Sequence, residues 1–549
     1  MSSAFRGKVA SSGRRHASLI AVFLGFFLFG SAWAFAAPFD GSPDEAEHII
    51  RAAGVVRGQV APPPEDAANG IGAFQTVPKS LQRACWLKGE PTLSAKNRAC
   101  WPSNDETEVR TASRAGRYNP VYYAIVGWPL TFAPTMKGVL LSRLMSVGLV
   151  ALGLTLAVHA ARLWSRHRVM LGGILLVATP TAMNLAGSIN PSAPEIAGGI
   201  LAFAALVPLL DPEREPSPLM VHLAGIGALM LVIPRALGPA WLAMGVGILL
   251  VPNTWAHVKR LLAMTAMRIW IGVLAVVSIA SGLWTVIQET GEPGVFIPVD
   301  SKLSRLDAVQ YVLLVRTNDY LEGMFRALSG GEINAWRPVV TLWLMAIGLT
   351  VMGAFVFGRW VDRWRMGATL AALWAFTSYG EITTANELRF PTQGRYLLPV
   401  FALVVFLAGE VLARTGTVDA LRARAMTRFF AFLTAGIHYV MLCTAMTRWQ
   451  AGLSGDWLRP RMSPLSGDWH PGFGSLNVLI LAAVGLAVLI AGFWMASALP
   501  VAAAPTSGDP APAEPAGVDS APTVEDAPAA GEPAAEARAV PTPEPAVQA

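Results

Sequence analysis

Residues 18–37 read SLIAVFLGFFLFGSAWAFAA, a run of twenty residues without a charged side chain. A helix rises about 1.5 Å per residue, so this run spans roughly the 30 Å hydrocarbon core of a bilayer. Four Lys and Arg residues precede it, and a polar stretch that opens with Pro38 follows it. We expect an uncleaved first membrane helix here. The alternative is a signal peptide, because Ala-Phe-Ala-Ala-Pro at its end resembles a cleavage site.

Apolar runs of this kind recur along most of the chain. Of its 549 residues, 53% are hydrophobic and 14% charged, whereas roughly 25% are charged in soluble domains. We therefore predict an all-α, polytopic membrane protein with about twelve transmembrane helices. The later spans are expected near residues 138–160, 169–187, 193–210, 218–235, 237–252, 269–287, 339–358, 367–385, 396–413, 429–447 and 475–499.

Basic residues in the short loops indicate the orientation of these spans. Clusters follow the second, sixth, eighth and tenth spans, on the same side as the N-terminus, and by the positive-inside rule that side is cytoplasmic. The clusters are Arg162, Arg166 and Arg168; Lys259, Arg260 and Arg268; Arg359, Arg363 and Arg365; and Arg414, Arg422, Arg424 and Arg428. Such short clusters lack the contiguous basic face of a nucleic-acid reader, so the net charge of +6 does not indicate nucleic-acid binding.

This orientation divides the chain into three parts. Residues 1–17 are expected to be a cytoplasmic N-terminus, and residues 18–499 a transmembrane domain with a large extracytoplasmic loop at 38–137. Residues 500–549, rich in Ala, Pro and Glu, are expected to be a disordered cytoplasmic tail because they cannot bury enough apolar surface to fold.

Two segments are less regular. Pro234, Arg235 and Gly238 separate the runs 218–235 and 237–252, which are either two full spans or a broken or re-entrant pair with Arg235 facing a cavity. Residues 306–328 have the charge pattern of an amphipathic helix that lies on the outer surface.

The first outer loop carries the strongest candidate chemistry. Residues 39–51 read FDGSPDEAEHIIR, in which Ser42 or Asp44 is a candidate helix cap. On such a helix Asp44, His48 and Arg51 share one face. A carboxylate there can act as a general base or help hold a divalent cation. The alternative is an acidic helix N-terminus that the helix dipole alone explains.

Two further outward segments supply polar groups. Residues 387–399 read ELRFPTQGRYLLP, in which Arg395 can pair with a phosphate and Tyr396 suits the membrane interface. The alternative is a pair of anchoring side chains. Asn190, between the third and fourth spans, either binds a ligand or forms an Asn-Pro turn, and the turn is favoured.

Cys85 and Cys100 lie in the first outer loop, each within Ala-Cys-Trp. We expect a disulfide between them outside the cytoplasm, and the alternative is two reduced cysteines. The sequence contains no P-loop, HExxH or Cys-x-x-Cys motif. Hydrolysis of ATP is therefore not expected.

These motifs, in this order, resemble the bacterial membrane-protein family called domain of unknown function family 2142. The resemblance covers roughly residues 18–450 and includes Asn-Pro-Val-Tyr-Tyr at 119–123 and Gln-Gly-Arg-Tyr at 393–396. The signature of the first loop consists of Pro43, Asp44, Glu45, Glu47, His48 and Arg51.

The family looks like part of the GT-C superfamily of glycosyltransferases. The resemblance implies transfer of a sugar from a polyprenyl-phosphate donor to a glycan or lipid-linked acceptor, on the extracytoplasmic face of the bacterial inner membrane. It implies Asp44 as the catalytic base, with Glu45 as second choice. Arg395 and Tyr396 would bind the phosphate, and membrane lipids would surround the protein. Further candidates for substrate binding are Asp40, His48, Arg51 and Asn190.

One departure concerns the residue after Asn190. Family members often carry an acidic residue there, but this chain has Pro191 and Ser192. The resemblance leaves a divalent cation, Mg or Mn, open. The competing functions are a transporter or flippase of a lipid-linked glycan, which predicts interrupted helices or buried charges, and a non-catalytic subunit of envelope assembly.

Overall fold

The computed structural model describes residues 3–63, 72–82, 92–97, 104–290, 302–326, 328, 333, 337–388, 390, 392–453 and 463–498. The chain divides into two units, residues 1–501 and 502–549, and everything below lies in the first. The predicted Cys85–Cys100 disulfide and the predicted tail lie outside the described residues.

Long apolar helices build the molecule, which confirms the prediction of an all-α polytopic membrane protein. Among the described residues, seven helices are long and apolar enough to cross a bilayer. They are α1 (Ser3–Ala36), α4 (Met136–Trp164), α7 (Ser192–Leu209), α11 (Thr265–Ile287), α14 (Arg337–Phe357), α17 (Ala420–Ala451) and α18 (Ser475–Ala498). A total of about twelve spans stays a prediction.

Several predicted spans are shorter or interrupted. The run 169–187 forms two helices because Pro180 cannot continue a helix, and Thr179 caps the second one through Ala182 N at 3.3 Å. The run 218–252 also forms two short helices, with Arg235 in the turn between them. These and the remaining helices of the bundle are α5 (Met170–Val177), α6 (Pro180–Ala186), α8 (Pro218–Val232), α9 (Gly238–Leu250), α10 (Trp255–Ala263), α15 (Trp360–Leu388) and α16 (Leu398–Arg414).

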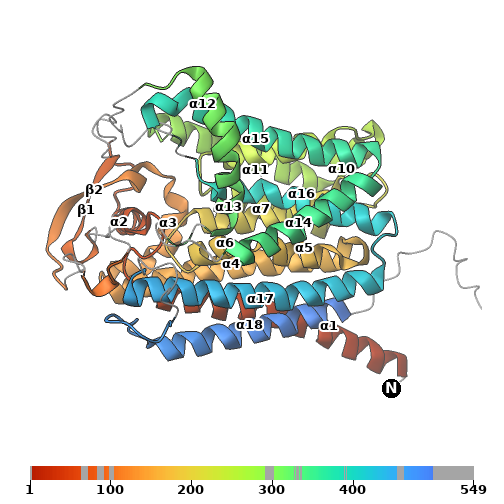
Figure 1. The fold of residues 1–549 in the computed structure, drawn as a ribbon. Coiled ribbons are helices and arrows are strands. Elements are labelled where there is room, and N and C mark those ends of the chain that lie inside the picture. The colour runs from red at the N-terminus through yellow and green to blue at the C-terminus, as the bar shows by residue number, and fades with distance from the viewer. Residues whose placement is uncertain are drawn as a thin grey trace, which may run out of the picture. The chain divides into compact units, whose positions relative to one another are not determined.

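The first outer loop forms a small subdomain of mixed structure. It contains α2 (Glu45–Val56), α3 (Pro120–Val126) and the antiparallel strands β1 (Ala73–Pro78) and β2 (Glu108–Ser113), with Ala73 opposite Ser113. Sequence analysis did not predict these strands. Figure 1 shows this subdomain at one end of the bundle and the N-terminus at the other.

The segment predicted as an amphipathic helix over 306–328 is helical as far as Arg326. It consists of α12 (Arg305–Tyr311), a π-helical turn (Val312–Arg316) and α13 (Thr317–Arg326). The apolar face of α13 buries Tyr320, Met324 and Phe325 and packs against the short 3₁₀ helix η8 (Gly394–Tyr396).

Ion pairs gather several of the basic clusters at one place. Arg166, which follows α4, and Arg359, which precedes α15, both pair with Glu213, at 3.0 and 3.2 Å. Arg414, at the end of α16, pairs with Asp362. Three clusters that sequence analysis assigned to one side of the membrane therefore lie together, although the membrane face itself stays a prediction.

Small residues allow α1 and α18 to pack closely, as is common between membrane helices. A Cβ atom added at Gly485 would lie 2.6 Å from the backbone nitrogen of Phe29. One added at Gly25 would lie 2.6 Å from the Cα of Leu489. The two helices cannot keep this separation if either position carries a side chain.

Gly485→Ala is therefore expected to lower the melting temperature of the full-length protein in detergent, with an overpacking cost of about 1–3 kcal/mol. Gly348→Ala in α14 is the matched control, because nothing lies within 4 Å of a Cβ added there. Equal melting temperatures for the two variants would contradict this packing.

Candidate functional site

The structure brings the acidic first loop and the arginine of the later motif into contact. Arg395 Nη2 donates to Asp44 Oδ2 at 2.7 Å, across 351 residues of sequence. The Arg395 side chain is 1% exposed, whereas that of Asp44 is 43% exposed. A buried guanidinium thus lies beneath an accessible carboxylate.

Backbone geometry leaves the carboxylate of Asp44 available for this contact. Asp44 is the N-cap residue of α2 but has φ 59° and makes no capping hydrogen bond. Asp40 caps the first turn instead, since its Oδ1 accepts from Ala46 N at 3.0 Å. Aspartate tolerates the left-handed region better than most residues. Asp44, one of the two predicted cap residues, thus occupies the N-cap position but makes no side-chain capping bond. Binding of substrate by Asp40 stays a prediction.

Glu45, the second choice for the base, lies in a buried ion pair. Both of its oxygens accept from Arg143, from Nε at 2.7 Å and Nη2 at 2.6 Å, and both side chains are 0% exposed. Arg143 also donates to the carbonyl oxygens of Ala34, Ala37 and Pro38. This geometry fixes the chain between α1 and α2, directly before Asp44.

Arg395 is positioned by a second buried carboxylate, that of Glu381 in α15. Glu381 accepts from Arg316 at 2.9 and 3.1 Å, from the Tyr320 hydroxyl at 2.5 Å and from Thr392 N at 2.9 Å. Arg316 donates in turn to the carbonyl oxygens of Phe390 and Thr392. These contacts hold the segment that leads into η8.

Gly394 allows this segment to approach α13. A Cβ atom added at Gly394 would lie 2.1 Å from the backbone oxygen of Tyr320. The glycine of the Gln-Gly-Arg-Tyr motif is therefore needed for the packing that places the next residue, Arg395, against Asp44.

The guanidinium of Arg395 has unused hydrogen-bonding capacity. Its Nε and Nη1 are buried and have no hydrogen-bond partner among the described residues. Its Nη2 donates to Asp44 and, at 3.4 Å, to the hydroxyl of Tyr396. Buried donors without a partner are costly and usually signal a missing acceptor.

A second arginine lies next to this one. The guanidinium of Arg235 lies 4.3 Å from the ring centroid of Tyr396 and 5.6 Å from that of Tyr118. The guanidinium of Arg395 lies 5.3 Å from the same Tyr396 ring. Arg235 donates to Ser192 Oγ at 2.8 Å, and its Nε lies 4.0 Å from Glu195 Oε2. Two cations therefore share the environment of Tyr396.

His48 lies near this cluster and shares a hydrogen bond of 2.8 Å with the hydroxyl of Tyr123. Burial, with a smaller contribution from Arg235 and Arg395, lowers the pKa of His48 to about 3, although Asp44 opposes the shift. The imidazole is thus neutral at physiological pH and a much weaker base than an ordinary histidine.

Arg51 and Asn190 bind backbone rather than the cluster. Arg51 donates to the carbonyl oxygen of Tyr118 at 2.7 and 3.2 Å and to those of Gln59 and Val60. Asn190 Nδ2 donates to the carbonyl oxygen of Pro43 at 3.0 Å, and its Oδ1 accepts from Ser192 N. Asn190 therefore supports the residue before Asp44, and substrate contacts by either residue stay predictions.

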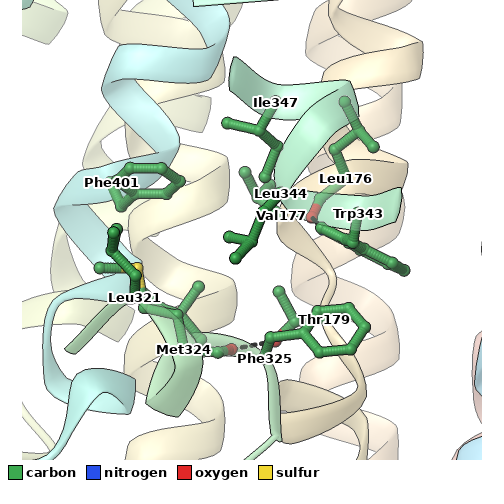
Figure 2. A pocket seen from close by; sticks show the side chains of 11 residues that line it. Leu176, Val177, Thr179, Leu321, Met324, Phe325, Trp343, Leu344, Ile347 and Phe401 are labelled. Atoms are coloured by element: carbon green, nitrogen blue, oxygen red, sulfur yellow. Dashed lines mark hydrogen bonds between the residues drawn. The ribbon is translucent and has the colours of Figure 1, made fainter. Parts of the chain in front are cut away.

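Two cavities lie near these residues. One, of about 200 Å³, has Arg235 and Tyr118 in its lining, as in the alternative in which Arg235 faces a cavity. The other, shown in Figure 2, is an apolar space of about 20 Å³. Thr179 donates there to the oxygen of Met324 at 2.8 Å, and Trp343 donates to that of Leu176 at 2.9 Å. These two polar side chains of the small cavity are thus already satisfied.

No group of three or more His, Cys, Asp or Glu side chains able to hold a metal ion occurs in the part of the chain that the structure describes. The described residues thus offer no such set of ligands for the divalent cation that the sequence left open.

Two residues that fix the site, Arg143 and Glu381, are not among the candidates predicted from the sequence. Both lie inside predicted spans, at 138–160 and 367–385. An ionisable residue within a span is rare and usually has a partner or a function, which was the available signal. The partners of the two residues were not predictable, because Glu45 is distant in sequence from Arg143 and Arg316 is distant from Glu381.

The fold and the site define a polytopic membrane protein whose first loop places a carboxylate against a buried arginine. Residues 27–404, from within α1 to within α16, match the family described as predicted membrane protein (DUF2142). The match covers more than half of the chain, and the protein belongs to this family.

Among solved structures, the chain is similar to two of ArnT from Cupriavidus metallidurans. The one bound to undecaprenyl phosphate is 13% identical with a TM-score of 0.41, over 89% of this chain and 76% of that chain. The apo structure is 14% identical with a TM-score of 0.39, over 90% and 77%. No curated protein matches the chain in sequence.

Glu45→Gln is expected to lower the unfolding free energy by about 3 kcal/mol or more, because it leaves the buried Arg143 cation without its carboxylate. Glu47→Gln in the same helix is the control: Glu47 Oε2 accepts from Arg114 N at 2.9 Å, and an amide oxygen can also accept. Chemical denaturation of both variants measures the difference. A loss in Glu45→Gln no larger than in Glu47→Gln would exclude a structural role for the ion pair.

His48 predicts a defined pH dependence of stability. Its folded-state pKa of about 3 is below the ordinary value of 6.5, so the unfolded chain binds the proton more readily. The stabilising contribution is present above pH 6.5 and is lost as the pH falls toward 3. Between pH 6.5 and 5 the loss is about 2 kcal/mol.

Denaturation at both pH values should therefore show a smaller acid-induced loss for His48→Gln than for wild type. Identical losses for the two proteins would show that His48 titrates normally in the folded state.

Proposed function

We propose that this protein is a glycosyltransferase that transfers a sugar from a polyprenyl-phosphate donor to a glycan or other acceptor at the extracytoplasmic face of the bacterial inner membrane. The observation that carries the proposal is the buried Arg395, whose Nε and Nη1 have no partner among the described residues while its Nη2 binds the accessible Asp44. An anionic ligand would satisfy these donors. The first-loop and Gln-Gly-Arg-Tyr motifs, which resemble those of a GT-C family, supply the reaction class.

The proposed reaction uses the two charges in sequence. Asp44 removes the proton from an acceptor hydroxyl, and the acceptor oxygen forms a bond to the anomeric carbon of the donor. The bond between that carbon and the phosphate oxygen breaks, and its electron pair stays on the phosphate. Arg395 stabilises the charge that develops there. The proton ends on Asp44, and polyprenyl phosphate leaves.

Asp44 is the best base among the candidate residues of the first loop. Glu45 is 0% exposed and has both oxygens bound to Arg143. The low pKa of His48 makes its imidazole a weak proton acceptor. The side chain of Asp44 is 43% exposed and pairs with Arg395, a cation that a phosphate can also bind.

The phosphate would thus compete with Asp44 for the same guanidinium. While Asp44 is paired with Arg395, the positive charge lowers its basicity. A phosphate that accepts from Nε or from Nη1 shares this positive charge and makes Asp44 a better base. Arg235, whose guanidinium lies 4.3 Å from the centroid of the Tyr396 ring, would add a second cation close to the leaving group.

Asp44→Asn and Arg395→Gln separate the two roles. Asn keeps the shape of the side chain and tolerates φ 59°, so Asp44→Asn removes the base without straining the backbone. We expect it to bind undecaprenyl phosphate at least as tightly as wild type but to lower transfer by roughly 10²–10⁴-fold. Arg395→Gln should weaken that binding by about 2 kcal/mol, roughly thirtyfold.

Transfer is measured by surface-glycan analysis of a deletion strain that expresses each variant, and binding by calorimetry on the full-length protein in nanodiscs. Asp105→Asn and Arg326→Gln are controls, since Asp105 and Arg326 pair with Lys79 and Glu322 instead. Normal glycans in a strain that stably expresses Asp44→Asn would disprove the proposed glycosyltransferase activity. Unchanged binding of undecaprenyl phosphate by Arg395→Gln would disprove the proposed phosphate site.

A further inference from the structure

The cavity of about 200 Å³ beside the arginine cluster has a mixed lining. Tyr118, Asn119 and Arg235 contribute polar groups from the loop side, and α11 contributes Trp284 and Thr285. Thr290 also lines it, and its hydroxyl is buried without a hydrogen-bond partner among the described residues. Hydroxyl groups, an amide and an indole ring at one cavity suit a ligand with both polar edges and apolar faces.

The wall of this cavity is held in place. Trp284 Nε1 donates to the carbonyl oxygen of Arg117 at 2.9 Å, and Arg117 Nη1 donates to that of Glu289 at 2.7 Å. The Thr285 hydroxyl donates to Ser281 O at 2.9 Å and still has an oxygen that can accept. The aromatic and hydroxyl groups therefore need little reordering to receive a ligand.

Its position joins the cavity to the site already described. Arg235 and Tyr118 line the cavity, and Arg235 also lies against the Tyr396 ring, on which Arg395 makes its own contact. A ligand in the cavity would lie next to a phosphate held by the arginines. By contrast, the small apolar cavity of Figure 2 offers a ligand only side-chain polar groups that are already bound.

The charge of the lining restricts the ligand further. Among the described residues that line the cavity, Arg235 carries the only charge and no carboxylate is present. Arg235 pairs with Glu195 at 4.0 Å, but Glu195 does not line the cavity. A cationic group in the cavity would meet the guanidinium of Arg235, whereas a hydroxyl or carboxylate would be accepted. The volume is below the roughly 300–1,000 Å³ of pockets for drug-sized molecules, which favours one sugar ring over a chain.

We infer that this cavity is the subsite for one monosaccharide ring of the donor or the acceptor, and that it accepts neutral or anionic sugars but not cationic amino sugars. The inference rests on the proposed function, because it takes the phosphate of the donor to bind at Arg395, next to the cavity. Trp284 contacts the apolar face of the ring, Thr285 and Thr290 bind its hydroxyl groups, and Arg235 sets the charge preference.

Saturation-transfer NMR on the full-length protein in nanodiscs tests this directly. The probes are D-glucose, D-galactose, D-mannose, D-glucuronate and, at about pH 6 where its amine is protonated, D-glucosamine. At least one neutral hexose or glucuronate should bind, and glucosamine should bind roughly tenfold more weakly or not at all. Binding of none of the neutral and anionic probes, or tighter binding of glucosamine, would overturn the inference.

Two variants locate the binding. Trp284→Leu should weaken it roughly tenfold, with Trp255→Leu as control. Thr285→Val keeps the side-chain shape and should weaken binding roughly fivefold. Thr350→Val is its matched control, because Thr350 makes the same bond one turn back, to Ala346 O at 2.7 Å, in α14. Wild-type binding in a folded Thr285→Val protein would place the sugar elsewhere.

Binding of undecaprenyl phosphate, measured beside sugar binding, distinguishes a failure of this inference from a failure of the proposed function. If Arg395→Gln loses undecaprenyl phosphate but keeps the sugar, both sites stand. If undecaprenyl phosphate binding depends on Arg395 while Trp284→Leu and Thr285→Val bind sugar normally, the subsite is wrong and the proposed function survives. In a working transferase, a higher KM for donor or for acceptor in Thr285→Val identifies which substrate supplies the ring.

Discussion

The contact between Arg395 and Asp44 is the interaction on which the site depends. A guanidinium that is 1% exposed keeps only part of its hydrogen-bonding capacity satisfied, and its carboxylate partner is accessible from outside. Burying an incompletely paired charge destabilises a fold, so the surrounding structure has to hold it in place. In a bundle of long apolar helices, polar contacts at their ends supply that support.

Two buried carboxylates hold the segments around Arg395 and Asp44 in place, and neither is exposed to act as a base. Glu45 fixes the chain before α2 through Arg143, and Glu381 fixes the chain before η8 through Arg316. Each is 0% exposed, so neither exchanges readily with solvent or substrate. The acids thus divide into Glu45 and Glu381, which are buried and hold the loops, and Asp44, whose side chain is 43% exposed. Asp44 and Glu45 are adjacent in sequence but differ in role. The left-handed backbone at Asp44 lets the two side chains reach different partners, Arg395 and Arg143.

Sequence alone predicted the helical membrane fold and named Asp44 and Arg395 as candidate site residues, because apolar length and short motifs are local signals. It did not predict that these two side chains form an ion pair. The sequence did not indicate which candidate residues would bind the backbone around the site instead of a substrate. Arg51 and Asn190 bind backbone oxygens of segments distant in sequence, and the capping role of Asp40 depends on a left-handed turn that composition does not reveal. The break before Pro180 was readable from proline chemistry, yet an apolar run of that length also fits one span.

The arrangement also favours an order of events. Before a donor binds, Arg395 forms an ion pair with Asp44. This ion pair disfavours protonation of the Asp44 carboxylate. An acceptor hydroxyl that arrived first would meet a weakened base. A phosphate that accepts from Nε or from Nη1 would share the positive charge, and only then would Asp44 gain the basicity that the proposed transfer requires. The same buried charge would thus bind the donor and delay activation of the acceptor until the donor is in place.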